Sequence, residues 1–273
     1  MITTTGTCRR GFKKWFKRRM EGLFKVKSRR WRVAVGHLKR LAAPPHLKIH
    51  VKEKAFTICP SPGPHSKFEC IPLLLIVRDY LGYAERAEEA KKIIKSGKIF
   101  VDGRPVKDPK FPAGLMDVIS IPETGENYRI IPIYRRGLDL IEIPKEEAGY
   151  KLCRIIRKMH VSGGHLQITL HDGRNIRFKE LTEDVMSYKT KDTLKISIPS
   201  QMVLEHLRLQ ENMYGLLIKG PKQGLHGRIV ELKTDVVYPA KPLVKLSTDE
   251  GDVTSLLDYL MVVGSDKPLV KLP

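Results

Sequence analysis

The segment Lys91–Ile121 constrains the fold most, because its pattern changes from helix to strand within a few residues. A lysine-bearing helix ends at Ser96-Gly97, and a glycine after the last turn commonly terminates a helix. The run KIFVDGR follows, and its strand-favouring residues precede Asp102-Gly103, a dipeptide typical of two-residue hairpins. LMDVISI then gives a further strand. The segment therefore predicts a compact unit of helix and small sheet in which the chain reverses at Asp102-Gly103.

Two short helices open this unit. An apolar stripe runs from Leu73 to Leu81 and ends at Gly82, where a left-handed glycine would terminate a helix. In the second helix, Ala90 and Ile94 share one face and lysines occupy another. Glu85 stands where serine or aspartate would cap this helix, so we expect a loosely formed first turn.

Downstream of this unit the pattern predicts strands. Residues 134–199 have the pattern of short strands and turns, and in LQITLHDGRNIRF apolar residues alternate before Asp172-Gly173, which indicates a hairpin. In YGLLIKGPKQGLHGRIVEL, four glycines separate apolar runs, as in tight turns between the strands of a curled barrel. We place this barrel at residues 207–266.

The N-terminal quarter has two different compositions. Five prolines between Gly36 and Cys70 remove backbone donors and fix φ, which predicts an extended arm. The preceding GFKKWFKRRMEGLFKVKSRRWR places aromatic residues at helical spacing among basic ones. It is a membrane-surface helix, a nucleic-acid-binding arm, or an addition from a start codon assigned too early, and we favour the last two. A start at Val33 would leave a short leader before His37.

The charge balance indicates a polyanionic partner. The chain has 50 Lys and Arg against 30 Asp and Glu, giving a net charge of +20 and a pI of about 9.8. Residues 1–35 hold 12 basic residues and one acidic residue, so the remainder is still basic, at +9. The apolar run IPLLLIV is broken by Arg78 and is far shorter than the ~20 residues of a membrane span. We therefore expect a soluble protein without membrane contact.

The cysteines give no sign of a metal or redox centre. Cys8, Cys59, Cys70 and Cys153 lack the close paired spacing of zinc ribbons and redox motifs, which suggests a reducing, intracellular compartment. Cys59, His65 and Cys70 could approach one another if the loop folded back, but their spacing is not that of a metal site. We predict no metal and no cofactor.

Basic residues concentrate on the helix and hairpin of the first unit. Together they would form a positive concave face suited to the phosphates of folded RNA, with affinity that falls steeply as salt rises. The alternative is that Glu88 pairs with Lys91 or Lys92 and the other lysines are merely solvated. The candidate contacts are Lys91, Lys92, Lys95, Lys98, Arg104, Lys107 and Lys110.

One stretch resembles a known RNA-binding unit. RDYLGYAERAEEAKKIIKSGKIFVDGRPVKD, followed by GLMDVISI, is similar to the alpha-L RNA-binding domain of ribosomal proteins, some tRNA synthetases and RNA pseudouridine synthases. The resemblance implies RNA docking and adds Arg78 to the candidates. It identifies the ligand class and leaves the activity open.

A wider set of motifs resembles one ribosomal family. HLKRLAAP, PSPGPH, FPAGLMDVISIPETGENYR and LHDGRNI together are similar to the archaeal and eukaryotic small-subunit family S4e, over His37 to Pro273. GLLIKGPKQGLHGRI is similar to a KOW motif, a barrel hairpin used near RNA. Residues 1–35 have no counterpart in the family, and near Glu85 the family commonly has a hydroxyl residue. The further candidate contacts are His37, Lys39, Arg40, Lys219, Lys222, His226 and Arg228.

Enzymatic readings are weaker. Pseudouridine synthases use an Asp in a Gly-Arg-Leu-Asp context, whereas RRGLDL places Arg before Gly137, and ~70 residues between the helical unit and the barrel are too few for a catalytic domain. We expect Asp139 to be a turn residue. His165, His171 and Asp172 have no glycine-framed nucleophilic serine and are interpreted as turn and surface residues. KGPKQGLHG lacks the Gly-Lys-Ser/Thr ending of a phosphate loop. We predict no catalytic residue.

The sequence thus predicts a structural constituent of the small ribosomal subunit that binds rRNA and supports translation. Its expected partners are small-subunit rRNA and neighbouring ribosomal proteins, in the cytoplasm, without obligate homo-oligomers; the alternatives are a pseudouridine-synthase-type enzyme and a transcription-elongation-type KOW factor. The predicted fold is α+β. The predicted domains are a basic N-terminal extension (1–36), a proline-rich arm (37–70), an alpha-L RNA-binding domain (71–133), a central β domain (134–206), a KOW SH3-like barrel (207–266) and a C-terminal tail (267–273).

Overall fold

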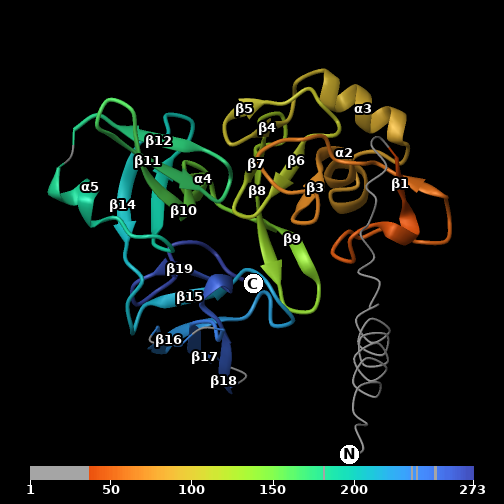
Figure 1. Cartoon of the computed structure of the whole chain (residues 1–273). Helices are drawn as coiled ribbons and strands as arrows, with labels where there is room; N and C mark the ends of the chain where they lie inside the picture. The colour runs from red at the N-terminus through yellow and green to blue at the C-terminus, as the bar shows by residue number, and fades with distance from the viewer. Residues whose placement is uncertain (1–36, 181, 235, 238, 249–250) are drawn as a thin grey trace, which may run out of the picture. The chain divides into compact units, whose positions relative to one another are not determined.

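The computed structural model describes residues 37–180, 182–234, 236–237, 239–248 and 251–273 (Figure 1). The predicted N-terminal extension, residues 1–36, lies outside them, together with every interpretation attached to it. The described chain forms one compact unit, His37–Pro273, built mostly from three five-stranded antiparallel sheets and a few short helices. The α+β class is confirmed at this level.

The proline-rich segment has only short elements. β1 (Leu38–Lys39) pairs with β2 (Phe56–Thr57), and η1 (Arg40–Ala42) lies between them in the sequence. The segment is fastened to the neighbouring sheet by Lys48, whose Nζ donates to both carboxylate oxygens of Asp139 at 2.8 Å. The arm is therefore packed against the rest of the unit.

The two predicted helices form near their expected positions. β3 (Cys70–Pro72) leads into α2 (Leu73–Leu75), which continues as η2 (Ile76–Tyr80), a π-type turn. Gly82, with φ +71°, follows its end as predicted.

α3 (Ala87–Lys95) ends before Gly97, whose φ is +78°. The N-cap is Arg86, one residue after the predicted Glu85, and its side chain makes no capping hydrogen bond. The carboxylate of Glu89 compensates by accepting the Arg86 backbone N–H at 3.3 Å.

The first five-stranded sheet follows α3. Asp102 and Gly103 both adopt positive φ, +48° and +72°, so the predicted two-residue hairpin turn is confirmed. The sheet order is β5-β4-β7-β8-β9, and β3 and β6 form a separate two-stranded sheet. Its strands are β4 (Phe100–Val101), β5 (Arg104–Pro105), β7 (Val118–Ile121), β8 (Glu126–Ile133) and β9 (Gly137–Glu142), with β6 (Pro112–Gly114) pairing β3.

The β8–β9 hairpin runs across the predicted domain boundary at residue 134. β8 pairs with β9 from Tyr128–Glu142 to Ile133–Gly137, so residues 137–142 belong to the first sheet. The physical reason is that the strand pairing continues through the turn after Ile133, which sequence periodicity did not reveal. α4 (Lys145–Ala148) then leads to the next sheet.

The central sheet has the order β12-β11-β10-β13-β14. Its longest strand, β10 (Tyr150–Val161), pairs with neighbours on both sides, and the alternation seen in LQITLHDGRNIRF forms the β11–β12 hairpin. Its apolar face packs into a core of its own. The other elements are β11 (His165–Leu170), β12 (Asn175–Phe178), α5 (Glu183–Ser187), β13 (Thr193–Ser197) and β14 (Val203–Leu207).

The C-terminal sheet has the order β18-β17-β16-β15-β19. The two edge strands of this sheet do not pair with each other among the described residues, so the predicted barrel is not closed by hydrogen bonds. The physical reason is that each edge strand has a single partner: β19 pairs only with β15, and β18 pairs only with β17, among the described residues. The elements are β15 (Tyr214–Leu217), β16 (His226–Lys233), β17 (Leu243–Thr248), β18 (Gly251–Leu256), η3 (Leu257–Tyr259) and β19 (Leu260–Gly264).

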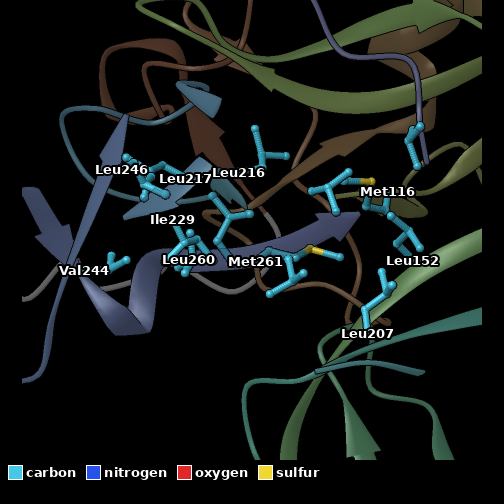
Figure 2. Close-up of a cluster of buried hydrophobic side chains, with 14 of the residues drawn as sticks. Met116, Leu152, Leu207, Leu216, Leu217, Ile229, Val244, Leu246, Leu260 and Met261 are labelled. Atoms are coloured by element: carbon cyan, nitrogen blue, oxygen red, sulfur yellow. The ribbon is translucent and has the colours of Figure 1, made fainter. Parts of the chain in front are cut away.

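One apolar core connects the C-terminal sheet to the other two (Figure 2). Met116 and Ile131 come from the first sheet region, Leu152 from β10 and Leu207 from β14, and all four are buried in the same cluster as the side chains of β15–β19. Burial of such apolar surface contributes about 25 cal/mol per Å². The predicted domains therefore share side-chain packing.

A buried charge cluster also joins the first and central sheets. Lys151 of β10 is 1% exposed, and its Nζ lies 3.0 Å from Asp102 and 2.5 Å from Asp117. It also lies 3.1 Å from Asp172. Arg174 reaches the same carboxylates, at 2.5 Å from Asp102 and 3.1 Å from Asp172. We call these five residues the Lys151 cluster; it holds turns of two sheets around one amine.

Backbone donors complete the bonding of the acidic side chains. Asp102 accepts the N–H of Val118 at 3.0 Å, and Asp117 accepts the N–H of Gly114 at 2.8 Å. Burial, the largest single influence, would raise the pKa of Asp117, but the Lys151 charge, His65 at 3.0 Å and the hydrogen bonds from both together hold that pKa well below its usual value. The carboxylate of Asp117 therefore stays ionised inside the fold.

Replacing Lys151 with methionine is expected to destabilise the fold strongly. The substitution keeps the aliphatic volume but leaves three carboxylates buried and mutually repelling, which costs about 3–5 kcal/mol of unfolding free energy. Urea denaturation at pH 7 measures the loss. The control Lys145→Met, at an exposed position in α4, is expected to change stability by less than about 0.5 kcal/mol. Equal effects of the two substitutions would contradict this account.

The stability is also expected to fall in mild acid because of His171. Its Nδ1 accepts the Arg154 N–H at 3.2 Å and its Nε2 lies 3.1 Å from the Leu115 carbonyl oxygen, a pattern that fits the neutral ring. Burial first, and then the charge of Lys151, lower the His171 pKa to about 4. Since an unfolded histidine has a pKa of about 6.5, this contribution is complete above pH 6.5 and is lost as the pH falls toward 4.

The expected loss is at most about 3 kcal/mol over that pH window. Urea midpoints measured from pH 7 to pH 4.5 test it, with His171→Gln expected to flatten the pH dependence. His160→Gln, at the exposed end of β10, serves as the control and is expected to retain the slope. An unflattened slope in the His171 variant would refute the assignment.

Candidate nucleic-acid interface

The outward face of α3 carries three of the predicted RNA contacts. Ala90 and Ile94 are fully buried, so the helix exposes the side chains of Lys91, Lys92 and Lys95. Among the described residues none of these lysines forms an ion pair, and the alternative in which Glu88 pairs with Lys91 or Lys92 does not occur. These ammonium groups are available to an external anion.

The hairpin and the loop after it continue this positive surface. Arg104, Lys107 and Lys110 are exposed. The Lys107 side chain lies next to Gly97, because a Cβ added at Gly97 would be 3.4 Å from the Cε atom of Lys107. Lys107 therefore reaches the C-terminal end of α3. Lys98 is also exposed but lies 2.9 Å from Glu123, an exposed pair of the kind that contributes little. The structure thus brings the helix and hairpin candidates together.

Other predicted contacts are engaged inside the protein. Arg40 is only 6% exposed and donates to the His50 and Phe56 carbonyl oxygens, so its guanidinium is engaged within the arm and its predicted RNA contact stays a prediction. The cause is that the arm folds back around its guanidinium. Arg78 is half-buried and donates to the neighbouring Asp79 at 2.7 and 2.8 Å.

The first residues of the described chain are accessible. His37 and Lys39 are exposed on either side of buried Leu38, and the His37 ring lies 5.9 Å from that of Phe56. They stand apart in the sequence from the α3 lysines. The structure leaves both side chains open to a ligand.

The four candidates of the C-terminal sheet have different environments. Lys219 is exposed but lies 2.7 Å from Glu69, and Arg228 is exposed with Asp266 at 3.7 Å. Lys222 is half-buried and has no ion pair among the described residues. His226 is held by the Tyr214 hydroxyl at 2.8 Å. Three of the four candidates thus have a partner within the described part of the protein.

Two aspartates considered as catalytic candidates, Asp139 and Asp172, pair with lysines inside the protein. Asp139 lies in strand β9, 7% exposed and bonded to Lys48, so the expectation of a turn residue is wrong. Asp172 is 2% exposed within the Lys151 cluster, so its interpretation as a surface residue is wrong too. In both cases the buried carboxylate pairs with a lysine that is distant in the sequence, Lys48 for Asp139 and Lys151 for Asp172.

Cys59, His65 and Cys70 do not gather around a common metal position. Over the described ranges, no group of three or more His, Cys, Asp or Glu side chains could hold a metal ion. Within the same ranges, no helix has the length and apolar character needed to cross a membrane.

Three cations that join the sheets, two of them buried and Arg154 half-buried, were not predicted from the sequence. Besides Lys151, Arg129 is fully buried and donates to the Glu147 and Tyr150 carbonyl oxygens at 2.7 and 2.8 Å. Arg154 Nη1 donates to the carbonyl oxygens of Asp258 and Leu260, both at 2.8 Å. The available signal was their position within apolar runs such as KLCRII, where an isolated charge usually has an internal partner.

Three family models match the chain. The model of the RS4NT (NUC023) domain matches residues 36–67, that of the S4 domain matches residues 73–119, and that of the ribosomal family S4e matches residues 124–203. The S4 match covers both short helices and the β4–β5 hairpin that carry most of the candidate contacts.

Relatives extend the similarity over nearly the whole described chain. The small ribosomal subunit protein eS4 of Staphylothermus marinus is 45% identical over 243 residues, covering 87% of this chain and 95% of the relative. The chain belongs to the S4e family of ribosomal proteins. The eS4 protein of Methanocaldococcus jannaschii is also 45% identical, covering 86% of this chain and 97% of the relative. The family resemblance stated from the motifs is confirmed.

A solved S4e structure agrees. The 30S ribosomal protein S4e of Thermoplasma acidophilum superposes with a TM-score of 0.60 at 29% identity, covering 72% of this chain and 96% of that protein. The S4e fold is thus shared.

Proposed function

We propose that this chain is a structural constituent of the small ribosomal subunit that binds rRNA and catalyses no reaction. The observation that carries the proposal is the 43–45% identity over 86–87% of the chain to relatives named as small ribosomal subunit proteins. The exposed cations supply the physical means, because each phosphate neutralised releases condensed counterions. Nothing among the relatives supports the pseudouridine-synthase or elongation-factor alternatives.

Three modules share the RNA contact in this proposal. The proline-rich arm (37–70) follows the RNA, the alpha-L unit (71–133) docks through α3 and its hairpin, and a KOW-type unit (207–266) contacts RNA through its glycine-rich loop. The S4 domain match supports the second module and the five-stranded C-terminal sheet is compatible with the third. The central β domain (134–206) holds them in fixed relation, and 267–273 is a tail.

The accessible cations divide into two classes. Those without an internal ion pair are the primary contacts. Those in ion pairs exchange their acidic partner for a phosphate, at low cost where the pair is exposed and at higher cost for the half-buried Arg78–Asp79 pair. The first class is His37, Lys39, Lys91, Lys92, Lys95, Arg104, Lys107, Lys110 and Lys222. The second is Arg78, Lys98, Lys219 and Arg228, with His226 as a hydrogen-bonding contact.

The proposed setting is the cytoplasmic ribosome. There the chain would contact small-subunit rRNA and neighbouring ribosomal proteins, with no obligate homo-oligomer. Each surface alone binds weakly, and their fixed spacing makes the second and third contacts intramolecular, which raises the overall affinity.

Reversing the charge of the α3 face is expected to weaken RNA binding. The triple variant Lys91→Glu, Lys92→Glu and Lys95→Glu should lower affinity for small-subunit rRNA, and the slope of log affinity against log salt should flatten by about 0.7–0.9 per lost phosphate contact. Filter binding at several salt concentrations measures both quantities. The three side chains are exposed, so the urea midpoint should stay near that of the wild type.

A charge-matched variant distinguishes an effect of the α3 surface from an effect of the lower net charge. Arg136→Glu, Lys145→Glu and Arg208→Glu changes three other exposed cations by the same amount, and should lower affinity less and leave the slope nearly intact. Equal slopes in the α3 variant and the wild type would count against the α3 face. Cosedimentation of the cellular protein with small subunits would support the assignment, whereas its association with RNA polymerase would favour an elongation role.

A further inference from the structure

The central sheet exposes a face that holds none of the predicted contacts. In the register of β10, β11 and β12, Arg157 lies opposite Thr169, which lies opposite Asn175. One row further, Met159 lies opposite Gln167, which lies opposite Arg177. Directly opposed residues point to the same side of a sheet. We call this the outer sheet face: Arg157, Met159, Val161, His165, Gln167, Thr169, Asn175 and Arg177.

In β11 and β12 the intervening residues point to the other side and are apolar, while β10 contributes Lys158 and His160 there. Leu166 and Ile168 are fully buried, and Ile176 and Phe178 pack against the same core. The outer sheet face therefore faces away from that core. Four of its side chains are exposed, namely those of Arg157, Met159, Asn175 and Arg177.

The charge of the outer sheet face is one-sided. It has two arginines and no acidic residue, and the sequence holds no Asp or Glu between Glu147 and Asp172. Neither Arg157 nor Arg177 forms an ion pair within the described residues. The remaining side chains are mostly hydrogen-bonding ones, since Gln167, Thr169 and Asn175 share the face. Such a surface is complementary to phosphates and base edges, and it offers little apolar area to a protein partner.

A cavity of about 620 Å³ opens at the end of this face. Ile156 and Thr169 line it from β10 and β11, and Phe68 of the arm, 51% exposed, lines it as well. Lys219 and Gln223 of the predicted KOW loop also line it. This volume lies within the range of pockets that take small ligands. Aromatic walls next to cations are typical of sites that hold an unstacked base.

We propose that the outer sheet face and this cavity bind a single-stranded segment of RNA. Arg157 and Arg177 contact its phosphates, and one unstacked base enters the cavity against Phe68 while Lys219 leaves Glu69 for the phosphate of that nucleotide. The inference rests on the proposed rRNA-binding function and deepens it by assigning the central sheet a binding role. A duplex is disfavoured as the ligand because its bases are stacked inward and cannot reach the cavity.

The test uses the full-length chain with two probes, a single-stranded uridine dodecamer and a 12-base-pair RNA duplex. Fluorescence anisotropy gives the affinity for each across a salt series. The variant Arg157→Glu with Arg177→Glu is expected to bind the single strand at least about 10-fold less tightly and to lower the salt slope by about 1.4, for two lost contacts at about 0.7 each. The matched control is Arg136→Glu with Lys145→Glu, which makes the same charge change at exposed positions elsewhere.

A second variant tests the cavity separately. Phe68→Ala is expected to weaken single-strand binding by about 5- to 100-fold, because one stacked base is lost, without altering the salt slope or duplex binding. Phe68 is half exposed, and an unchanged urea midpoint would confirm that the fold is retained. Crosslinks from isolated small subunits should join RNA to peptides spanning residues 157–177.

Three results would overturn the inference. These are equal losses in the arginine variant and its control, a Phe68 variant that binds the single strand normally, and an arginine variant that keeps RNA binding but loses a neighbouring ribosomal protein. In each of these cases, weakened rRNA binding by the α3 variant would leave the proposed function standing. If neither the α3 variant nor the central-sheet variants lost affinity for rRNA, both the proposed function and this inference would be contradicted.

Discussion

The ammonium group of Lys151 fixes the first and central sheets relative to each other. Three carboxylates and Arg174 surround it, and their side chains come from turns that are far apart in the sequence. A buried pair of this kind adds little net stability over an apolar core, but losing one partner leaves a charge inside that cannot be solvated. The cluster therefore restricts how the two sheets can be arranged: only the correct meeting of Asp102, Asp117 and Asp172 around Lys151 gives each of these carboxylates a cationic partner. Alternative packings of the same strands would leave one or more of these charges unpaired.

The same logic sorts the cations of this basic chain into two groups. Arg129, Lys151 and Arg154 donate to groups of other elements and hold the sheets together, while the α3 lysines and Arg104 point to solvent. The C-terminal sheet is fixed through Arg154 and through the core shared with Leu152 and Leu207. Because the scaffold is held from within, separate exposed surfaces keep a constant spacing. A constant spacing is what allows several weak phosphate contacts to act as one strong site on a folded RNA.

The predictable part of the fold is the local part. Asp102-Gly103 gives a hairpin because both residues tolerate positive φ, and α3 forms where Ala90 and Ile94 share a face; both signals lie within a few residues. The β8–β9 pairing across residue 134 and the inward turn of Asp139 toward Lys48 depend on partners that the local pattern does not contain. Exposure of the α3 lysines followed from the helical period, whereas burial of Arg40 followed from how the arm folds back. The acid-free run between Glu147 and Asp172 was visible in the sequence, but only the strand register shows that its arginines share a face with Arg177.

The exposed ion pairs have a further consequence for selectivity. Lys98 with Glu123 and Lys219 with Glu69 are held close, yet both partners remain about half exposed, so each pair contributes little to stability. An acidic neighbour lowers the attraction of that cation for a stray phosphate, because the phosphate must compete with a carboxylate already in place. In the proposed complex, a phosphate held nearby by the unpaired cations of α3 or of the outer sheet face would have a high local concentration and would displace the carboxylate readily. Paired cations would thus respond only to an RNA whose shape already satisfies the unpaired ones, and this order of contacts favours folded rRNA over arbitrary polyanions.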